Sequence, residues 1–391
     1  MKKKVAVAMS GGVDSGVAAA LLVEQGCDVI GLHLRFWTEG VKGLGVKDGF
    51  LEKIQNRCCN LESMEAARKT AAKLGIPFYV KDYAEDFKKI VVDYFLAEYA
   101  AGRTPNPCVV CNQFIKFGKL LEYTRALGCD YLATGHYARI VAARPWRAQE
   151  AVGDGGQTKG LRLQPSPPVY KLLKGIDEIK DQSYFLWTLT QDKLAHILFP
   201  VGDRKKSEVR KIARAKNLPV YTRPESFEVC FVLDNDYRDF LRRHIPETIR
   251  PGEVVNTKGE VIGRHFGLPL YTIGQRKGFV AKSSVPLYVV GMDVEKNQLI
   301  VGRGRESERK EFMVSSVNWI IQLPVASSQR SVLRCEVRIR HQGQLLNAKC
   351  KMQNAKTARV VLEEPVRGIT PGQSAVFYRG EEVLGGGIIE S

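Results

Sequence analysis

A short apolar run that passes directly into a glycine turn, and then into a helical pattern, restricts the fold most strongly. Residues Val5–Met9 are all apolar, Ser10-Gly11-Gly12 follows, and helical periodicity runs from Val13 to Gln25. An unbroken apolar strand that leads into a helix is typical of a buried parallel sheet. Asp28–Arg35 predicts the next strand. We therefore expect a doubly wound α/β domain with a parallel sheet at the N-terminus.

The pattern changes along the chain in a way that predicts further domains. Residues 142–168 are rich in Gly and Pro and predict a polar surface loop or insertion. From about Pro251, short strand-like runs alternate with Gly, Pro and Asn turns, which predicts a C-terminal β-barrel. We expect an α/β domain over residues 1–220, a small central linking domain over 221–286, and the barrel over 287–391.

Composition limits the classes of partner and compartment. The chain has 59 Lys and Arg against 42 Asp and Glu, a formal charge of +17, which attracts polyanions such as nucleic acid. A basic protein without a polyanionic partner is the alternative. No apolar run reaches the about 18 residues of a membrane-spanning helix, and Val5–Met9 is too short for a signal sequence. The nine cysteines argue against a disulfide scaffold. We expect a cytoplasmic protein with no membrane partner.

The segment Ser10-Gly11-Gly12-Val13-Asp14-Ser15 has the composition and position of a phosphate-binding loop. Glycines allow the backbone to approach a phosphate, and the N–H groups and dipole of the first helical turn hold the anion. The hydroxyls of Ser10 and Ser15 add donors, and Asp14 could hold Mg²⁺. The pattern is neither a Walker loop nor a dinucleotide fingerprint. It resembles the loop of enzymes that cleave ATP to AMP and pyrophosphate.

Two further segments carry cysteines in unusual settings. Asn106-Pro107-Cys108-Val109-Val110-Cys111-Asn112 has a proline-framed approach, and we expect a helix to begin just after Asn112. Cys111 would then lie beside a helix N-terminus, which favours a thiolate. Cys230 lies in an apolar stretch after a charged loop, and its local sequence favours a packing role.

With these motifs in order, the chain closely resembles the tRNA-specific 2-thiouridylases over nearly its whole length. The matching segments are Ser10–Ser15, Cys58-Cys59, Gly102–Asn112 with Ile115-Lys116-Phe117, Ala133–Arg139, Lys180–Phe185, Phe199–Gly202, Cys230-Phe231 and Tyr271–Gly278. The resemblance implies an N-terminal domain of the PP-loop ATP pyrophosphatase type. It also implies that ATP adenylates the C2 oxygen of the wobble uridine of tRNA, and that a persulfide sulfur then replaces that oxygen.

The resemblance also implies roles for individual residues. Cys230 would carry the persulfide, and Cys111 would act as the attacking or resolving cysteine, with a disulfide between the two when the sulfur leaves. ATP would be bound, with Mg²⁺, by Ala8, Met9, Ser10, Gly11, Gly12, Val13, Asp14, Ser15, Leu34 and Gly135. The target base would lie by Asn106, Pro107 and Cys108, and tRNA would contact His136, Lys180, Asp181, Gln182, Arg340, His341 and Gln373. A persulfide-donating relay protein is the implied partner, and we expect a monomer.

One departure from the family leaves the chemistry open. Many members carry an aspartate at the position of Cys108, where it is thought to act as a base or to orient the target. Here the Cys108 thiolate, or water, would take that role, or the chemistry differs. Cys108, Cys111 and Cys230 are also candidate ligands of an iron–sulfur cluster with one open iron site. A closed zinc site would need a fourth ligand, which the sequence does not indicate.

Basic side chains alternate along a strand-like run near the C-terminus. Arg334, Arg338 and Arg340 have the period of two that places them on one face, which predicts phosphate contacts along tRNA or a solvated barrel face. Two other functions fit parts of this pattern. One is an argininosuccinate- or GMP-synthetase-like ligase, which would not need Cys111 and Cys230. The other is an RNA-binding protein with a vestigial nucleotide loop.

Overall fold

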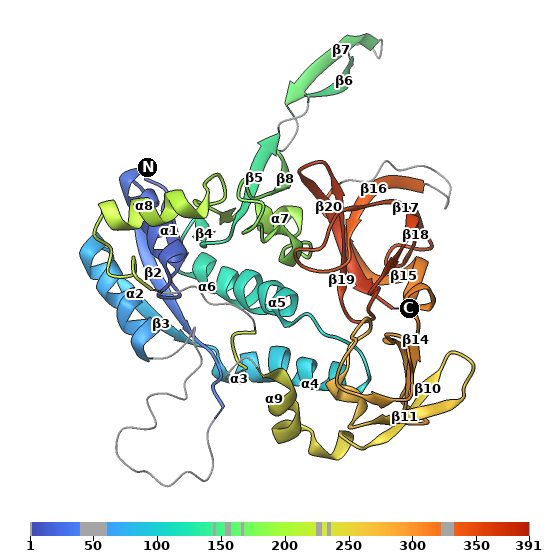
Figure 1. Cartoon of the computed structure of the whole chain (residues 1–391). Helices are drawn as coiled ribbons and strands as arrows, with labels where there is room; N and C mark the ends of the chain where they lie inside the picture. The colour runs from blue at the N-terminus through green and yellow to red at the C-terminus, as the bar shows by residue number, and fades with distance from the viewer. Residues whose placement is uncertain are drawn as a thin grey trace, which may run out of the picture.

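The structure of the 391-residue chain is a computed structural model. It describes residues 2–39, 61–143, 146–152, 158–165, 168–223, 229–232, 236–321 and 332–390. Three bodies follow one another along the chain: an α/β domain, a small five-stranded sheet and a C-terminal barrel (Figure 1).

The N-terminal domain is built on a parallel sheet with strand order β3-β2-β1-β4-β9. Alternate residues of β1 face opposite helical layers, and Val5, Ala6 and Val7 are fully buried. The strand order changes direction between β1 and β4, and in open α/β sheets ligands bind at the carboxyl ends of the strands at such a point. The predicted doubly wound sheet is thereby confirmed. Its strands are β1 (Lys4–Ala8), β2 (Asp28–Arg35), β3 (Phe78–Asp82), β4 (Tyr131–Ala133) and β9 (Ile197–Leu198).

Helices cover both faces of this sheet. One face carries α1 (Val13–Glu24) and α2 (Leu61–Leu74), with α8 (Lys206–Ala215) packed on α1. The other face is covered by two long composite helices whose aromatic and aliphatic side chains form the main core. The first joins α3 (Ala84–Phe87), the π-helical η2 (Lys88–Val92) and α4 (Asp93–Ala100). The second joins α5 (Pro107–Val110), the π-helical η3 (Cys111–Leu120) and α6 (Leu121–Ala126).

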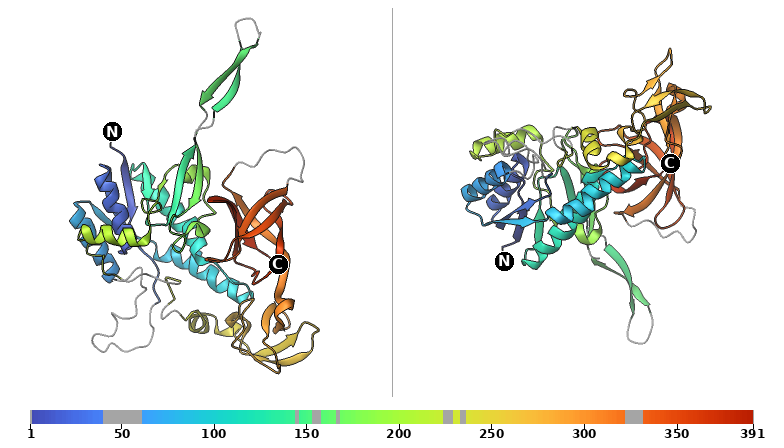
Figure 2. Two further views of the ribbon diagram at one scale, coloured as in Figure 1. Left: turned by 45° about the horizontal axis from the view of Figure 1, so that its top comes forward. Right: turned by 90° about the horizontal axis from the view of Figure 1, so that it is seen from below.

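A strand pair leaves this domain and joins the barrel. Strands β5 (Ala138–Ala143) and β8 (Val169–Lys174) pair with each other, and β8 also pairs with β20 of the barrel. The predicted surface insertion is a β-hairpin where a loop was expected, because β6 (Trp146–Val152) and β7 (Thr158–Pro165) pair along their length. This hairpin projects away from the body in Figures 1 and 2.

Short helices lie between the strands of both domains. In the α/β domain, η4 (Ser183–Phe185) and α7 (Gln191–Leu194) precede β9, whereas α9 (Tyr237–His244) and η6 (Pro246–Thr248) lead into the central sheet and η7 (Leu268–Leu270) lies between two of its strands. The central sheet has the order β12-β11-β10-β14-β13 around an apolar core that includes Val254 and Leu299. Its strands are β10 (Gly252–Asn256), β11 (Val261–His265), β12 (Val280–Ala281), β13 (Tyr288–Asp293) and β14 (Gln298–Gly302). Because β13 and β14 pair within this sheet, we propose that the central domain extends to about residue 303, past the expected boundary at residue 286.

The last six strands close into an antiparallel barrel, as the sequence predicts. The pairing order is β15-β18-β17-β16-β19-β20, and β20 pairs back with β15. The barrel interior is filled by side chains such as Phe312, Val360 and Phe377. A one-turn 3₁₀ helix, η8 (Gly304–Ser307), leads into it. The strands are β15 (Glu308–Trp319), β16 (Val332–Arg338), β17 (Leu346–Met352), β18 (Ala358–Arg367), β19 (Ser374–Arg379) and β20 (Glu382–Ile389).

Candidate active site

The predicted phosphate loop lies at the carboxyl end of β1 and caps α1. Gly11 has φ +78°, and a Cβ atom there would lie 2.1 Å from the carbonyl oxygen of Ser63, so only glycine fits. The Ser15 hydroxyl accepts from the Ser10 N–H at 3.2 Å and donates to the Gly12 carbonyl at 3.1 Å. These short-range bonds fix the turn that exposes the first helical N–H groups to an anion.

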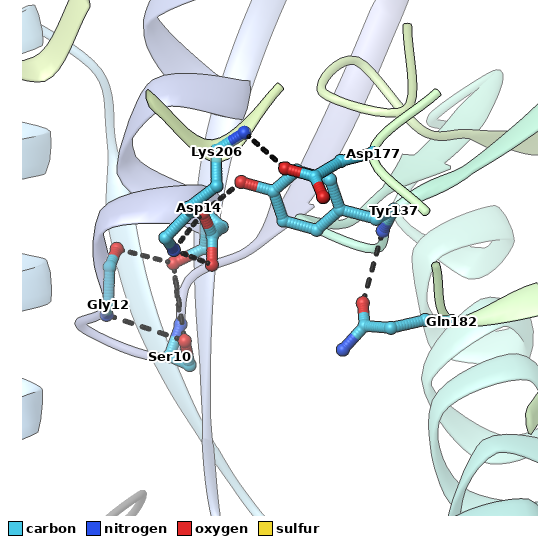
Figure 3. A network of polar contacts seen from close by, with 8 residues as sticks. Ser10, Gly12, Asp14, Tyr137, Asp177, Gln182 and Lys206 are labelled. Atoms are coloured by element: carbon cyan, nitrogen blue, oxygen red, sulfur yellow. Dashed lines mark hydrogen bonds and ion pairs between the residues drawn. The ribbon is translucent and has the colours of Figure 1, made fainter. Parts of the chain in front are cut away.

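The carboxylate of Asp14, in the first turn of α1, is held by two side chains from elsewhere in the domain (Figure 3). The Tyr137 hydroxyl donates to Asp14 Oδ1 at 2.7 Å, and the Lys206 ammonium lies 2.6 and 2.7 Å from the two carboxylate oxygens. Asp177 accepts from the Lys206 backbone N–H at 2.8 Å and so fixes the start of α8. An ammonium group is thereby placed beside the phosphate loop.

This cation was not identified from the sequence. Lys206 follows Lys205 in a segment that reads as an ordinary amphipathic helix, and nothing local distinguishes it. The arrangement also bears on Mg²⁺, because both oxygens of Asp14 already accept from Lys206 or Tyr137. A carboxylate has about four lone-pair sites and, among the described residues, Oδ2 accepts only from Lys206, so a metal ion could bind Asp14 beside the ammonium, and a Mg²⁺ ligand role for Asp14 stays a prediction.

The remaining predicted ATP residues gather around the same edge of the sheet. A Cβ atom on Gly135, which follows β4, would lie 2.8 Å from the backbone nitrogen of Ser15, so the two segments touch through their backbones. Met9 and Val13 are buried and can offer only backbone atoms to a ligand. Leu34 is the last buried residue of β2, the strand next to β1. The structure therefore brings together residues from three separate stretches of sequence.

The helix that carries Cys108 and Cys111 begins earlier than the sequence predicted. Asn106 caps it by accepting from the Val109 N–H at 3.4 Å, and Pro107 occupies the first helical turn. Both are favoured at these positions, which explains the early start. Cys108, which is half-buried, thus lies in the first turn, whereas buried Cys111 lies one turn further on. The expectation that Cys111 lies beside the helix N-terminus is wrong, and that position belongs to Cys108.

Cys230 packs on the same apolar core as Cys111. The side chain of Cys230 is half-buried, and the cluster that it contacts includes both Cys111 and Leu34. Its neighbour Phe231 is fixed by ring contacts with Phe95 at 5.2 Å, Phe240 at 5.6 Å and Phe87 at 5.7 Å between centroids. The structure thus brings two cysteines that are far apart in the sequence onto one core.

Within the described ranges, no group of three His, Cys, Asp or Glu side chains is arranged to hold a metal ion. Cys108, Cys111 and Cys230 therefore do not form a preassembled cluster site in this conformation. Cys58 and Cys59, and residues 224–228 before Cys230, lie outside the described residues.

His136 lies between the phosphate loop and the cysteine-bearing helix. Its Nδ1 is 2.6 Å from the Thr134 hydroxyl, and its ring packs against Phe117 at 5.6 Å and Phe199 at 5.7 Å. Desolvation, with a further contribution from the Lys116 charge, holds the pKa of His136 well below its ordinary value. The imidazole is therefore neutral at pH 7 and offers hydrogen bonds without a positive charge.

The predicted RNA contacts at residues 180–182 differ in exposure. Lys180 and Gln182 are half-buried, and Gln182 Oε1 accepts from the Tyr137 N–H at 3.0 Å. Asp181 is 3% exposed, so its carboxylate cannot reach RNA in this structure. It joins the α/β domain to the barrel through bonds from the Gly175 N–H, the Ser183 N–H and hydroxyl, and the Arg338 guanidinium.

The arginines of the barrel divide between surface and interior. Arg334 and Arg340 are exposed, but Arg338 pairs with buried Asp181 at 3.1 Å, so the three do not form one solvated basic face. The His341 ring packs on Phe185 with centroids 4.4 Å apart, and desolvation lowers the pKa of His341.

Gln373, another predicted RNA contact, faces the segment before the cysteines. Its Nε2 donates to the carbonyl oxygens of Thr104 at 3.1 Å and Pro105 at 2.9 Å. The barrel therefore contacts the approach to Cys108 directly.

Comparison with known proteins matches every part of this architecture. Residues 3–234 match the family model described as tRNA methyl transferase HUP domain, residues 238–303 the tRNA methyl transferase PRC-barrel domain, and residues 309–389 the aminomethyltransferase beta-barrel domain. The chain is similar to the tRNA-specific 2-thiouridylase MnmA of Symbiobacterium thermophilum, with 46% identity over 99% of this chain and 92% of the relative. It is 42% identical to the protein of the same name from Carboxydothermus hydrogenoformans, over 100% of this chain and 98% of the relative.

Solved structures show only a distant likeness. The U34-tRNA thiolase NcsA from Methanococcus maripaludis with its [4Fe-4S] cluster matches with a TM-score of 0.32 and 18% identity, over 63% of this chain and 68% of that one. No helix among the described residues has the length and apolar character needed to cross a membrane.

Proposed function

This chain belongs to the tRNA-specific 2-thiouridylase family, and we propose how its residues carry out the ATP-dependent thiolation of a tRNA uridine. It is a tRNA-uridine sulfurtransferase that uses ATP. The observation that supports the residue assignment most strongly is that Cys111 and Cys230 pack on one core together with Leu34 of the ATP site. We propose that activation and sulfur delivery take place at neighbouring positions on this core.

The first step is activation of the base. The first-turn amides of α1 and the Ser10 and Ser15 hydroxyls hold the ATP phosphates, and Lys206 adds positive charge beside them. The uridine O2 attacks the α-phosphorus, the bond to pyrophosphate breaks, and an O-adenylated base results. We assign charge neutralisation by the protein to Lys206, and Asp14 would be the ligand of a bound Mg²⁺.

The second step replaces oxygen with sulfur. The terminal sulfur of a Cys230 persulfide attacks C2, and AMP leaves with the original oxygen. The Cys111 thiolate then attacks the Cys230 sulfur, which leaves the transferred sulfur on the base and joins the two cysteines in a disulfide. A persulfide donor supplies each new sulfur, and a reductant restores the two thiols. An iron–sulfur cluster held by Cys108, Cys111 and Cys230 is the alternative route.

Cys108 lies closer to the helix N-terminus than Cys111 does, at the position of the family's aspartate. A thiolate is favoured at a helix N-terminus. We propose that Cys108 accepts the N3 proton of the uridine during adenylation, with Asn106 and Pro107 beside the base.

Exposed and half-buried polar groups are left to hold tRNA. We propose contacts from His136, Lys180, Gln182, Arg340 and His341, and we remove Asp181 from this set because it is buried. Phosphate contacts by the basic surface predict that affinity for tRNA falls steeply with salt. A sulfur relay protein, a cytoplasmic location and a monomeric state are further parts of the proposal.

Mass spectrometry of tRNA nucleosides after incubation with ATP, Mg²⁺ and a persulfide donor tests the proposal. Wild-type protein should form 2-thiouridine, whereas Cys111→Ser and Cys230→Ser should each form none and still bind ATP. Cys129→Ser, at a buried cysteine near the far end of the sheet, is the matched control. Thiouridine formed by either active-site variant would contradict the assigned roles. Loss of activity in protein shown to contain no iron or sulfide would instead favour a cluster.

A further inference from the structure

The barrel holds the chain segment that leads into Cys108 and Cys111. The Thr104 N–H donates to the Pro371 carbonyl at 2.9 Å, and Gln373 Nε2 bonds the next two carbonyls, of Thr104 and Pro105. The turn approaches closely, because a Cβ atom on Gly372 would lie 2.8 Å from the Thr104 carbonyl oxygen. Three consecutive barrel residues thus contact two consecutive residues of the cysteine-bearing segment.

The donors of the Gln373 amide are already in use. A primary amide has two N–H groups, and here each has a backbone carbonyl within hydrogen-bond distance. An RNA phosphate, which is only an acceptor, would have to compete with these carbonyls. The amide is therefore built to hold the protein backbone in place.

The contacts continue toward the reacting cysteines. Pro105 is followed by Asn106, whose side chain caps the helix that carries Cys108 and Cys111. The next barrel residue contacts the α/β domain as well, because the Tyr184 hydroxyl donates to the Ser374 carbonyl at 2.9 Å. The cap therefore directly follows backbone that the barrel holds.

We propose that Gln373 is a positioning residue that sets the cysteine-bearing helix, and that the turn 368–374 is part of the active-site scaffold. Arg340, an exposed candidate for RNA contact, reaches the same turn, with Nη1 3.8 Å from where a Cβ atom on Gly368 would lie. The turn 368–374 therefore contacts both the segment that leads to the cysteines and Arg340, which would hold RNA. This inference rests on the proposed roles of the cysteines, but its main test does not require thiolation.

Alkylation of Cys108 and Cys111 in the absence of RNA is the direct measurement. Gln373→Glu keeps the shape of the side chain but turns a carboxylate toward two carbonyl oxygens, and Gln373→Met removes the donors without adding charge. We expect the iodoacetamide rate at these cysteines, followed by peptide mass spectrometry, to change about fivefold or more in both variants. Gln353→Glu, at an exposed glutamine of the barrel, is the matched control and should not change it.

Binding and turnover then separate positioning from RNA contact. In Gln373→Met, single-turnover thiolation should fall about tenfold while the affinity for tRNA stays within about twofold. Unchanged alkylation rates together with a tenfold loss of tRNA affinity would overturn the inference and make Gln373 an RNA contact. If wild-type protein forms no thiouridine, the proposed function fails, but the alkylation rates still decide the role of Gln373.

Discussion

The phosphate loop and the cysteine-bearing segment belong to one domain, but they are held in place in different ways. The loop is six consecutive residues fixed by bonds among Ser10, Gly12 and Ser15, with one ion pair from a distance. The cysteine-bearing segment is fixed by its own core packing and, in addition, by the barrel through Pro371 and Gln373. We call the phosphate loop the nucleotide half of the site and the cysteine-bearing segment the sulfur half. A change that disturbs the barrel should therefore impair sulfur transfer more than ATP binding.

The largest expected effect tests whether the phosphate loop depends on its own backbone. Gly11→Ala would place a Cβ atom 2.1 Å from the Ser63 carbonyl oxygen at φ +78°, so the loop must shift. We expect the affinity for ATP, measured by calorimetry, to fall at least about 1000-fold, which equals about 4 kcal/mol.

Gly26→Ala is the control for that variant. Gly26 has φ +77°, but an added Cβ would meet nothing within 4 Å. This variant has the same backbone strain without the clash, so it should lose about 1 kcal/mol of stability and no ATP affinity. Equal loss of ATP affinity in both variants would show that the close approach to Ser63 is not what shapes the loop.

The next effect tests the dependence of the sulfur half on the barrel. Asp181→Asn leaves the Arg338 guanidinium beside a neutral amide at a buried contact, which should lower the free energy of unfolding by about 3 kcal/mol in denaturant titrations. Thiolation should fall much more than ATP affinity, because β8 and the barrel pack less firmly. Asp192→Asn, at an exposed acid in α7, is the control. If Asp181→Asn has normal stability but binds tRNA more weakly, Asp181 contacts RNA, as the sequence predicted.

The same contrast explains what the sequence could predict. The loop Ser10–Ser15 was identified because strand, turn and helix are contiguous, and the periodicity of β1 and α1 predicted the sheet. The helix start at Pro107 was missed, although the Asn106 cap and the proline were local signals. The contacts of Asp181, Gln373 and Lys206 could not be found, because each depends on the three-dimensional approach of segments that share no sequence pattern.

A smaller effect tests the ion pair between the phosphate loop and α8. Lys206→Met removes the ammonium that faces Asp14, and its side chain is only 11% exposed. We expect ATP affinity to fall about tenfold, because charge-assisted contacts to phosphate contribute about 1.5–3 kcal/mol. Lys211→Met, on an exposed position of the same helix, should bind ATP normally. If Lys206→Met loses only stability, the ion pair is structural and does not serve the nucleotide.

The smallest effect concerns His136, which lies where the two halves of the site meet. Its pKa is lowered in the folded state, so below about pH 6.5 the unfolded chain binds a proton that the folded protein excludes. The contribution of His136 to stability should therefore decrease as the pH falls from 6.5, by up to about 1.4 kcal/mol per pH unit. His136→Gln keeps a polar side chain without a titrating ring, so the slope of unfolding free energy against pH between 7 and 5 should be shallower than in wild type. His196→Gln, at a histidine whose Nδ1 meets the Asp130 carbonyl away from both halves, is the comparison variant. If the slope of unfolding free energy against pH is the same in His136→Gln as in wild type, His136 is protonated in the folded protein as readily as in the unfolded chain. Its ring would then be more accessible to water than its packing against Phe117 and Phe199 indicates.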